Sequence, residues 1–321
     1  MADLTVLPMS LAPLVVTGAT GTVGREVVRH LVAAGLDVRA AVRDPGAPGA
    51  ETAGTARFDY EAPETFAGAL GGATAVFWLR PPPVSDVRGV MGPAMAYAAA
   101  HGAGGRPPHA VVLSVVGANP LVPHWHLERL ARRLRMPTTV LRPSFFMQNL
   151  ATAHAAEIRD RDEVFVPAGG GKTSFVDARD VGEAAARVMR EGGRPAGLGH
   201  AGRTYTLTGS EALSYDEVAA ILTRVLGRPV RYARPSPRAF RARKTAEGLA
   251  PDFVATMGRI YLVARLGLAG GLAPDLGRLL SRPPGTFEAF ARDYAPVWVR
   301  GGAHEDTSST RRRGVPPRGT G

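Results

Sequence analysis

The chain has 321 residues, 45% of them hydrophobic and 21% charged, and it contains no cysteine. This length and composition predict a globular protein of one large domain or two. The absence of cysteine excludes a disulfide framework, a thiol nucleophile and a thiolate metal site.

The formal net charge of +11 comes almost entirely from arginine, because Lys172 and Lys244 are the only lysines. The densest basic run, Arg311–Arg313, falls within residues 301–321, which are rich in glycine, serine, threonine and proline. We expect this segment to be a disordered basic tail. A nucleic-acid-binding protein usually gathers its positive charge on one face, with aromatic residues between the cations. No nucleic-acid partner is therefore expected.

No apolar run reaches the about 18 uninterrupted residues expected of a membrane-spanning helix. The first residues also lack the pattern of a secretory signal. We therefore expect a cytoplasmic protein without a membrane partner. No pattern in the sequence predicts an oligomeric state.

Short β-branched runs alternate with helical patterns through the first half of the chain. Strands are expected at 14–17, 37–42, 56–59, 74–79, 109–116 and 138–143, and helices near 22–34, 63–70, 86–101 and 124–135. This alternation predicts an α/β fold, a doubly wound parallel sheet of the Rossmann type. Because the strands are apolar on both faces, helices should cover the sheet on either side.

After Pro143 the predicted elements become shorter. We expect a helix at about 178–190, a strand at 204–209, a helix that begins at the Ser214–Glu217 capping box and ends at Gly227, a strand at 229–234, and helices to about 297. The predicted organisation is a flexible N-terminus (1–12), a dinucleotide-binding domain (13–150), a smaller, mostly helical substrate lobe on the carboxyl edge of the sheet (151–300), and the basic tail (301–321).

The stretch "VTGATGTVGREVV" at 16–28 places Gly18, Gly21 and Gly24 after the first strand and at the head of the first helix. In a dinucleotide-binding turn, glycines at this spacing allow the tight turn, the close approach of a pyrophosphate and the packing of helix on strand. The anion then lies at the helix N-terminus, where free N–H groups and the helix dipole stabilise it.

The residue after the second strand distinguishes between the two nicotinamide dinucleotides. An NAD site usually carries an acidic residue about 20 positions after the glycines, whereas Arg43 stands 19 residues beyond Gly24. A guanidinium suits a 2′-phosphate, so the sequence favours NADP(H). Asp44 keeps NAD(H) as the alternative, because its carboxylate could bind the ribose or pair with Arg43.

Several motifs together resemble the NmrA-like family of atypical short-chain dehydrogenases/reductases. These are "VTGATGTVGREVV", "AAVRDP", "VVLSVVGA", "VLRPSFFMQN", "SFVDARDV" and "TYTLTGSEALSYDEVAAIL", and the resemblance runs from about residue 13 to residue 297. The family includes NAD(P)H-dependent quinone and azo-dye reductases and also NADP-sensing regulators. The resemblance therefore implies a dinucleotide cofactor without specifying a substrate.

The resemblance also implies a role for each residue on a family position. The expected cofactor-binding residues are Thr17, Gly18, Ala19, Thr20, Gly21, Thr22, Val23 and Gly24 at the pyrophosphate, Arg43 at the 2′-phosphate, Asp59 and Tyr60 beside the adenine, Leu79, Arg80 and Pro81 at the ribose, and Ser114, Val115 and Phe145 at the nicotinamide half.

An aromatic-lined acceptor pocket is expected just past the carboxyl ends of the strands, where doubly wound folds bind their ligands. Its expected wall consists of Trp125, Phe145, Phe146 and Met147. Core packing is the alternative role for the segment that contains Phe145, Phe146 and Met147.

Classical members of the superfamily use a tyrosine with a lysine four residues later, and this pair is missing. The residues four positions before the two lysines are Ala168 and Phe240. In the equivalent helix the place of the lysine is taken by His124, four residues before Glu128. Ser114 and His124 are therefore the candidate catalytic residues, since an imidazole can donate a proton near neutral pH. The sequence favours a structural or cofactor-orienting role for His124.

Other candidate groups have simpler explanations. Asp177 and Asp180 precede a helix, so we expect Asp177 to be its N-cap and Asp180 to interact with the helix dipole. His124 and His126 face different sides of a helix, and no further ligand completes a metal site. No metal is expected, and a role for Lys172 in binding an anion is left open.

Two functions fit these patterns. The first is an NAD(P)H-dependent oxidoreductase that passes hydride to a small electron-poor acceptor, such as a quinone, an enone or an azo compound. The alternative is a non-catalytic NADP(H) sensor that binds a protein partner. A biosynthetic reductase acting on a polyketide-like ketone is a third, and it requires a proton donor that the sequence does not identify. The sequence favours the first function, with a small-molecule acceptor as partner.

Overall fold

The computed structural model of the chain describes residues 13–46, 54–192 and 199–300. The predicted flexible N-terminus (1–12) and basic tail (301–321) lie outside these residues. Within the described ranges, no helix has the length and apolar character needed to cross a membrane.

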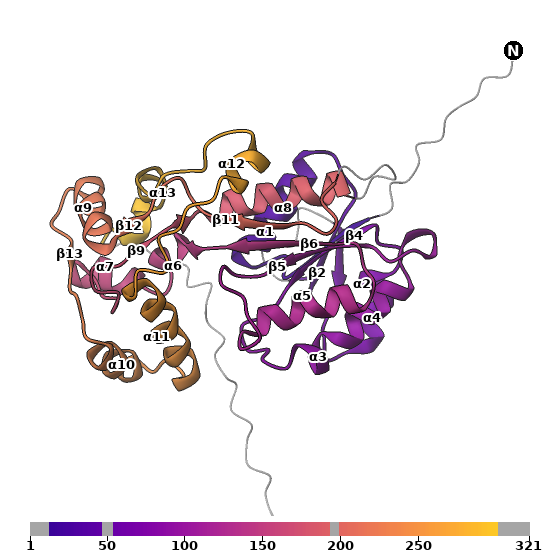
Figure 1. The fold of residues 1–321 in the computed structure, drawn as a ribbon, viewed down its shortest axis with the longest axis horizontal. Helices are drawn as coiled ribbons and strands as arrows, with labels where there is room; N and C mark the ends of the chain where they lie inside the picture. Colours follow the sequence, from indigo (N-terminus) through magenta and orange to yellow (C-terminus); the bar gives the residue numbers. More distant parts are fainter. Residues whose placement is uncertain (1–12, 47–53, 193–198, 301–321) are drawn as a thin grey trace, which may run out of the picture.

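A seven-stranded parallel sheet forms the larger part of the molecule (Figure 1). Its strands, in spatial order, are β11 (Thr204–Leu207), β6 (Thr138–Pro143), β5 (His109–Leu113), β4 (Ala75–Leu79), β1 (Leu14–Thr17), β2 (Val38–Val42) and β3 (Gly54–Arg57). Every pairing in it is parallel, so the predicted doubly wound fold is confirmed. Because the strand order reverses between β1 and β4, a crevice is expected at their carboxyl ends.

Helices cover both faces of the sheet. One face packs against α1 (Thr22–Ala33), α8 (Ala178–Gly192) and α12 (Asp275–Leu280), and the other against α2 (Phe66–Leu70), α3 (Val87–Val90), α4 (Gly92–Ala100) and α5 (Pro123–Arg133). Two short 3₁₀ helices, η1 (Pro63–Thr65) before α2 and η2 (Ala103–Gly105) after α4, lie in the connections. Neighbouring residues of a strand point to opposite faces. Val16 therefore joins the core under α1 and α8, whereas Val15 joins the core under α2, α4 and α5.

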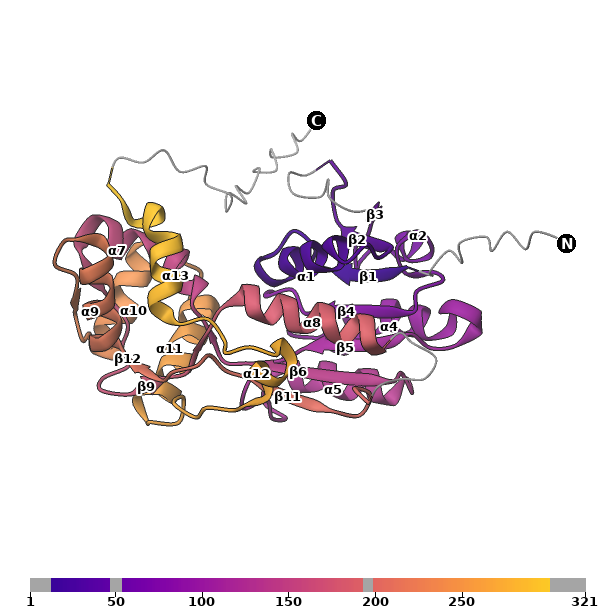
Figure 2. The same cartoon turned by 90° about the horizontal axis from the view of Figure 1, so that it is seen from above.

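The predicted domain boundary at residue 150 differs from the structure. The helix expected at 178–190 and the strand expected at 204–209 were assigned to the smaller lobe, but α8 packs along α1 (Figure 2) and β11 pairs with β6 as the edge of the sheet. The apolar face of α8 and Leu207 of β11 are buried in the core of the first domain. The chain therefore leaves the sheet domain after β6 and returns to it.

The smaller lobe is mostly helical and lies beside the sheet (Figure 1). It contains α6 (Gln148–Ala151), α7 (Ala155–Arg161), α9 (Tyr215–Leu226), α10 (Pro237–Ala246), α11 (Pro251–Arg265), α13 (Phe287–Tyr294) and η3 (Ala295–Trp298). Three short strand pairs join it: β7 (Phe145–Phe146) with β10 (Phe175–Val176), β8 (Glu163–Val164) with β13 (Arg231–Tyr232), and β9 (Lys172–Thr173) with β12 (Leu213–Ser214). The predicted capping box of Ser214 and Glu217 is confirmed, and Gly227 ends α9 in the left-handed conformation.

Both β6 and β11 run out of the sheet at their carboxyl ends and continue into this lobe. The lobe has its own core, in which the rings of Phe175, Tyr215 and Tyr261 are packed together. The carboxyl edge of the sheet, where the crevice is expected, therefore borders the helical lobe.

Candidate functional site

The turn between β1 and α1 is too tight for side chains at two of its glycines. Gly18 has a φ of +64°, which is strained for other residues, and a Cβ there would lie 3.2 Å from a methyl group of Leu79. A Cβ on Gly24 would lie 2.1 Å from the carbonyl oxygen of Gly18. These glycines therefore bring the N-terminus of α1 directly onto the end of β1.

The N-terminus of α1 is open to a ligand. Its N-cap is Gly21, no side chain caps it, and its first turn carries no acidic residue in the described chain. Thr20, Gly21 and Thr22 are exposed, whereas the side chains of Ala19 and Val23 are buried in the core. A helix end with free N–H groups and no competing carboxylate suits the pyrophosphate of a dinucleotide.

Thr17 joins the two strands at which the strand order reverses. Its hydroxyl donates to the carbonyl oxygen of Phe77 at 2.8 Å and accepts a hydrogen bond from the N–H of Leu79 at 3.0 Å. The side chain is fully buried and hydrogen-bonded to β4. Thr17 therefore fixes the end of β1, where the turn begins, against β4.

An open hollow of about 320 Å³ lies at the end of β2, lined by Thr20, Val42, Arg43 and Asp44. Arg43 has no ion pair among the described residues, and the Asp44 carboxylate accepts a hydrogen bond from the N–H of Gly46 at 2.9 Å. The ion pair between Arg43 and Asp44 that the sequence left open is therefore not formed in the described chain. An exposed guanidinium beside this turn is suited to a phosphate group.

The residues expected beside the adenine lie after β3. Asp59 accepts a hydrogen bond from the N–H of Glu61 at 3.0 Å, which shapes the local turn. Tyr60 packs edge-on against Phe58, and burial raises the pKa of its phenol above the ordinary value. Tyr60 also reaches the carbonyl oxygen of Leu79 at 3.4 Å, so the ends of β3 and β4 meet here.

Arg80 holds the proline-rich loop after β4. Its Nη1 donates to the carbonyl oxygens of Pro81, Pro82 and Val84 at 3.0, 3.0 and 2.6 Å. Its Nε lies 3.5 Å from Nε2 of His124 in the first turn of α5. Burial, together with the charge of Arg80, lowers the pKa of His124 to about 4 although Glu128 opposes this shift. The loop after β4 and the N-terminus of α5 are thus linked at the carboxyl edge.

Ser114, at the end of β5, is held by a buried carboxylate. Its hydroxyl donates to Oε1 of Glu128 at 2.6 Å, and Glu128 also accepts two hydrogen bonds from Arg142 at 2.9 and 2.8 Å. Glu128 is 1% exposed, so its charge is balanced by this bidentate pair on β6. Val115 follows as a half-buried residue. The hydroxyl hydrogen of Ser114 is therefore engaged by Glu128.

The four residues expected to line the acceptor pocket differ in their burial. Phe145 and Phe146 are half-buried in β7, and Trp125 is half-buried beneath the guanidinium of Arg129, 5.1 Å from its ring. Met147 is fully buried in the core of the lobe. Because its side chain does not reach a surface, we do not retain Met147 in the acceptor wall.

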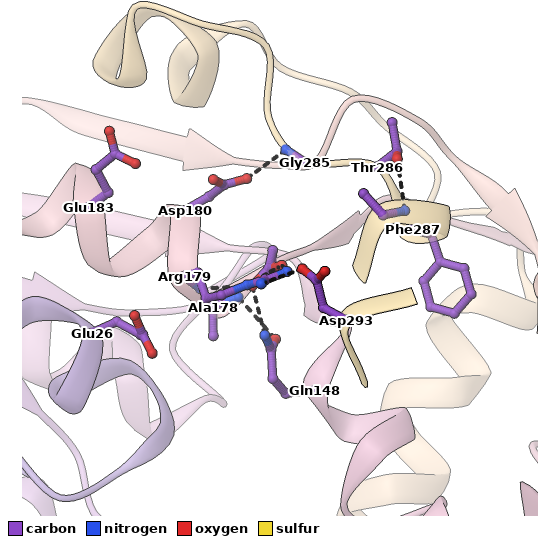
Figure 3. Close-up of polar contacts among 12 residues, drawn as sticks. Glu26, Gln148, Ala178, Arg179, Asp180, Glu183, Gly285, Thr286, Phe287 and Asp293 are labelled. Atoms are coloured by element: carbon purple, nitrogen blue, oxygen red, sulfur yellow. Dashed lines mark hydrogen bonds and ion pairs between the residues drawn. The ribbon is translucent and has the colours of Figure 1, made fainter. Parts of the chain in front are cut away.

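A polar junction joins Gln148, at the start of α6, to the start of α8 (Figure 3). Gln148 donates to Asp177 at 2.7 Å and accepts from the N–H of Ala178 at 3.0 Å. Arg179 binds Asp177 with two nitrogens and Asp293 of α13 with a third. Asp177 also accepts from the N–H of Arg179, so its expected helix-capping bond is present. The junction joins α6, α8 and α13 beside the aromatic segment.

Asp180 and Lys172 both contact charged side chains of the protein itself. Asp180 is in the first turn of α8, as predicted, and it binds Arg282 and the N–H of Gly285 at 2.8 and 2.7 Å. Lys172 is exposed in the lobe and lies 3.5 Å from Glu217. Across the described chain, no group of three potential metal-ligating side chains is found.

Sequence reasoning assigned no role to Glu128, Arg142 or Gln148. The available signal was a charged residue on the buried side of an amphipathic helix, because Leu127, Glu128 and Ala131 are the buried residues of α5. A carboxylate at such a position requires a cation from a neighbouring element. Its partner Arg142 could be identified only once β5 and β6 were known to be adjacent.

Comparisons with known proteins agree with this architecture. A model of the NmrA-like family matches residues 12–253. The chain is 34% identical over 296 residues to the NAD(P)H azoreductase of Xenophilus azovorans, covering 89% of this chain and 99% of that protein. Its fold is similar to that of the NADPH-dependent quinone oxidoreductase of Escherichia coli complexed with NADPH, with a TM-score of 0.74, 24% identity, and coverage of 87% of this chain and 99% of that one. It is also similar to that of NmrA, a negative transcriptional regulator, in complex with NADP. This likeness has a TM-score of 0.70 and 19% identity, and it covers 90% of this chain and 96% of that one.

Proposed function

This chain belongs to the NmrA-like family, and from that premise we propose that it is an NAD(P)H-dependent reductase that passes hydride to a small electron-poor acceptor. Quinones, enones and azo compounds are the acceptor classes that fit the site. The similarity to an azoreductase over nearly the whole length of both chains supports this assignment.

The residues at the carboxyl edge fit a nicotinamide dinucleotide, which supplies the hydride when bound. The N–H groups at the head of α1 would hold the pyrophosphate, and Gly18 and Gly24 allow the close approach of α1 to β1 that presents these groups. Arg43 would hold the 2′-phosphate, which makes NADP(H) the preferred cofactor and NAD(H) the alternative. The observation that carries the proposal is the uncapped, acid-free end of α1 beside the hollow at Arg43.

The groups near the expected nicotinamide favour an acceptor that needs little acid catalysis. The hydroxyl of Ser114 donates a hydrogen bond to Glu128, and the pKa of His124 is lowered to about 4. Neither group is a strong proton donor at neutral pH. A quinone or azo acceptor spreads the incoming charge over its conjugated system and can then take its proton from water. The half-buried rings of Trp125, Phe145 and Phe146 suit such a planar, apolar molecule.

The test is an assay of purified protein with NADPH and a panel of menadione, a simple enone and an azo dye. Sustained loss of NADPH absorbance, above the rate without acceptor, is the expected result. Tight binding of NADP⁺ without turnover on any acceptor would favour the NADP(H)-sensing alternative. Failure to bind either dinucleotide in calorimetry would refute both functions.

A further inference from the structure

The contact between Arg80 and His124 determines which ring nitrogen of the histidine carries its proton. The guanidinium of Arg80 only donates hydrogen bonds, and its Nε lies 3.5 Å from Nε2 of His124. This contact favours Nε2 as the acceptor, and the proton of a neutral ring then lies on Nδ1. The three backbone carbonyls that bind Nη1 of Arg80 keep this guanidinium in place.

The environment also keeps the ring neutral. The charged or titratable groups that act on it are Arg80, from the end of β4, and Glu128, from its own helix, and burial adds to the effect of Arg80. The resulting pKa of about 4 means that the imidazole carries one proton throughout the neutral range. A neutral imidazole is a poor acid but a good hydrogen-bond donor, and enzymes use it to polarise a carbonyl oxygen.

Nδ1 of His124 is buried and has no hydrogen-bond partner in the described structure. A buried N–H without a partner destabilises a protein by about 1–3 kcal/mol, so such groups normally meet a ligand or an ordered water. This nitrogen belongs to the first turn of α5, next to the ends of β4 and β5 where the crevice is expected. An oxygen of a molecule bound in this crevice would give the nitrogen such a partner.

We propose that Arg80 fixes neutral His124 as the Nδ1–H tautomer, and that this N–H donates a hydrogen bond to an oxygen of the bound ligand. The oxygen is a ribose hydroxyl of the dinucleotide or the carbonyl oxygen of a quinone or enone acceptor. His124 is then a donor that keeps its proton, and Arg80 is its positioning residue. The ligand part of this proposal rests on the proposed reductase function, whereas the tautomer does not.

The tautomer is tested by long-range ¹H–¹⁵N spectra of the protein without any substrate. Among the eight histidines, the signals of His124 are identified by their loss in His124→Gln. We expect them to show the Nδ1–H form from about pH 8 to about pH 5, and to shift toward a mixture in Arg80→Met, which removes the donor to Nε2. An Nε2–H form, or titration near the ordinary histidine pKa, overturns the proposal whether or not the protein is a reductase.

The donor role is tested by comparing His124→Gln, which retains an N–H donor, with His124→Phe, which does not. His126→Gln, on the same helix, is the matched control because its ring is exposed and hydrogen-bonds the backbone carbonyl of Pro120. We expect the NADPH affinity or the kcat with menadione to fall about tenfold in His124→Phe, and at most about threefold in His124→Gln. A higher Kd for NADPH identifies the ribose as the partner. A fall confined to kcat with menadione identifies the acceptor.

Two results of this comparison would contradict the donor role. His124→Phe with an unchanged Kd and kcat would show that the N–H binds no ligand. His124→Gln as impaired as His124→Phe would show that the shape of the ring, rather than its N–H, is what the site requires.

Discussion

Single residues at the carboxyl edge divide into those that are engaged within the protein and those that are free for a ligand. Thr17 is bound to β4, Ser114 to Glu128, and Asp44 to the N–H of Gly46. Arg43 has no ion pair in the described ranges and borders the hollow at the end of β2. Of these four residues, Arg43 is therefore the one suited to bind the 2′-phosphate that distinguishes NADP(H) from NAD(H).

Replacing Arg43 by alanine should weaken NADPH binding much more than NADH binding. Charge-assisted hydrogen bonds to the 2′-phosphate contribute about 1.5–3 kcal/mol, and NADH has no such phosphate. The measurement is the Kd of both reduced dinucleotides by calorimetry, at two salt concentrations because the effect is electrostatic.

Arg106→Ala is the matched control for Arg43→Ala. Arg106 is also exposed, but it precedes β5 and so lies at the amino end of the sheet, opposite the expected ligand. Arg106→Ala should leave the dissociation constants of both NADPH and NADH unchanged. Equal losses for NADPH and NADH in Arg43→Ala would show that the 2′-phosphate lies elsewhere.

At the scale of elements, the site depends on how closely α1 approaches β1. The Cβ of an alanine at position 24 would meet the backbone of both Gly18 and Ala19, at 2.1 Å from the oxygen of Gly18. Backbone atoms cannot move aside as a flexible side chain can. The helix itself must then shift, and its N–H groups shift with it.

Gly24→Ala should therefore lower both stability and cofactor affinity. Overpacking of this kind destabilises by about 1–3 kcal/mol, and displaced N–H groups should weaken binding of both dinucleotides. Urea denaturation and calorimetry measure the two effects. Gly258→Ala is the control, because this helical position in α11 has nothing within 4 Å of the added carbon, and alanine should stabilise the helix by up to about 1 kcal/mol.

The opposite pattern, in which Gly24→Ala is as stable as the natural protein and binds NADPH normally, would mean that the turn is less constrained than its geometry indicates. If Gly258→Ala is destabilised instead, the loss in Gly24→Ala could not be attributed to the turn alone.

The strands and the glycine turn were predictable because their signals are local. β-branched runs identified six of the sheet strands, and the glycine spacing identified the head of α1. The seventh strand, β11, was predicted as a strand but placed in the wrong domain, because its pairing with β6 depends on a return of the chain that no local pattern encodes. The boundary at residue 150 was wrong for the same reason.

Individual side-chain contacts were much harder to predict. The Ser114–Glu128–Arg142 group combines β5, α5 and β6, and it exists only because the strand order makes these three elements neighbours. Met147 was grouped with Phe145 and Phe146 by sequence alone, although it lies beyond β7, in a helical conformation at the start of α6. Residue type thus indicated the chemistry, whereas tertiary structure decided which side chains meet.

A basic segment in the lobe shows how tertiary contacts change the meaning of a charge count. Residues 228–244 contain seven basic residues and no acidic one. In the structure five of the seven lie in ion pairs with acidic residues from other segments: Arg228, Arg231, Arg234, Arg243 and Lys244. The segment therefore stabilises the lobe and does not form a continuous unpaired basic stripe.

At the scale of the whole molecule, the two ends of the sheet have different roles. The carboxyl end carries the open helix terminus, the hollow and the orphaned nitrogen of His124. At the amino end, His109 is 4% exposed, and its Nε2 lies 2.8 Å from the hydroxyl of Thr139. That hydroxyl donates to the carbonyl oxygen of His200, so it accepts from His109. Stability at this end can therefore be altered without touching the site.

Burial, with a smaller effect of His200, lowers the pKa of His109 to about 4. In the unfolded chain its pKa is about 6.5, so below that pH the unfolded state takes up a proton that the folded state lacks. The free energy of unfolding should therefore fall as the pH decreases from about 6.5 to about 4, by at most about 3 kcal/mol from this residue. His124, with its similarly lowered pKa, contributes in the same direction.

His109→Gln should flatten this dependence. Glutamine can still donate to Thr139 but cannot take up a proton, so the difference in stability between pH 6.5 and pH 4 should be smaller than in the natural protein by up to about 3 kcal/mol. Urea denaturation at several pH values measures it. His101→Gln is the control, since His101 is exposed and stacks on Tyr97, and its pH dependence should match that of the natural protein. Identical slopes for all three proteins would mean that His109 accepts a proton within the folded sheet, near Thr139 and Gly192, as readily as it does in water.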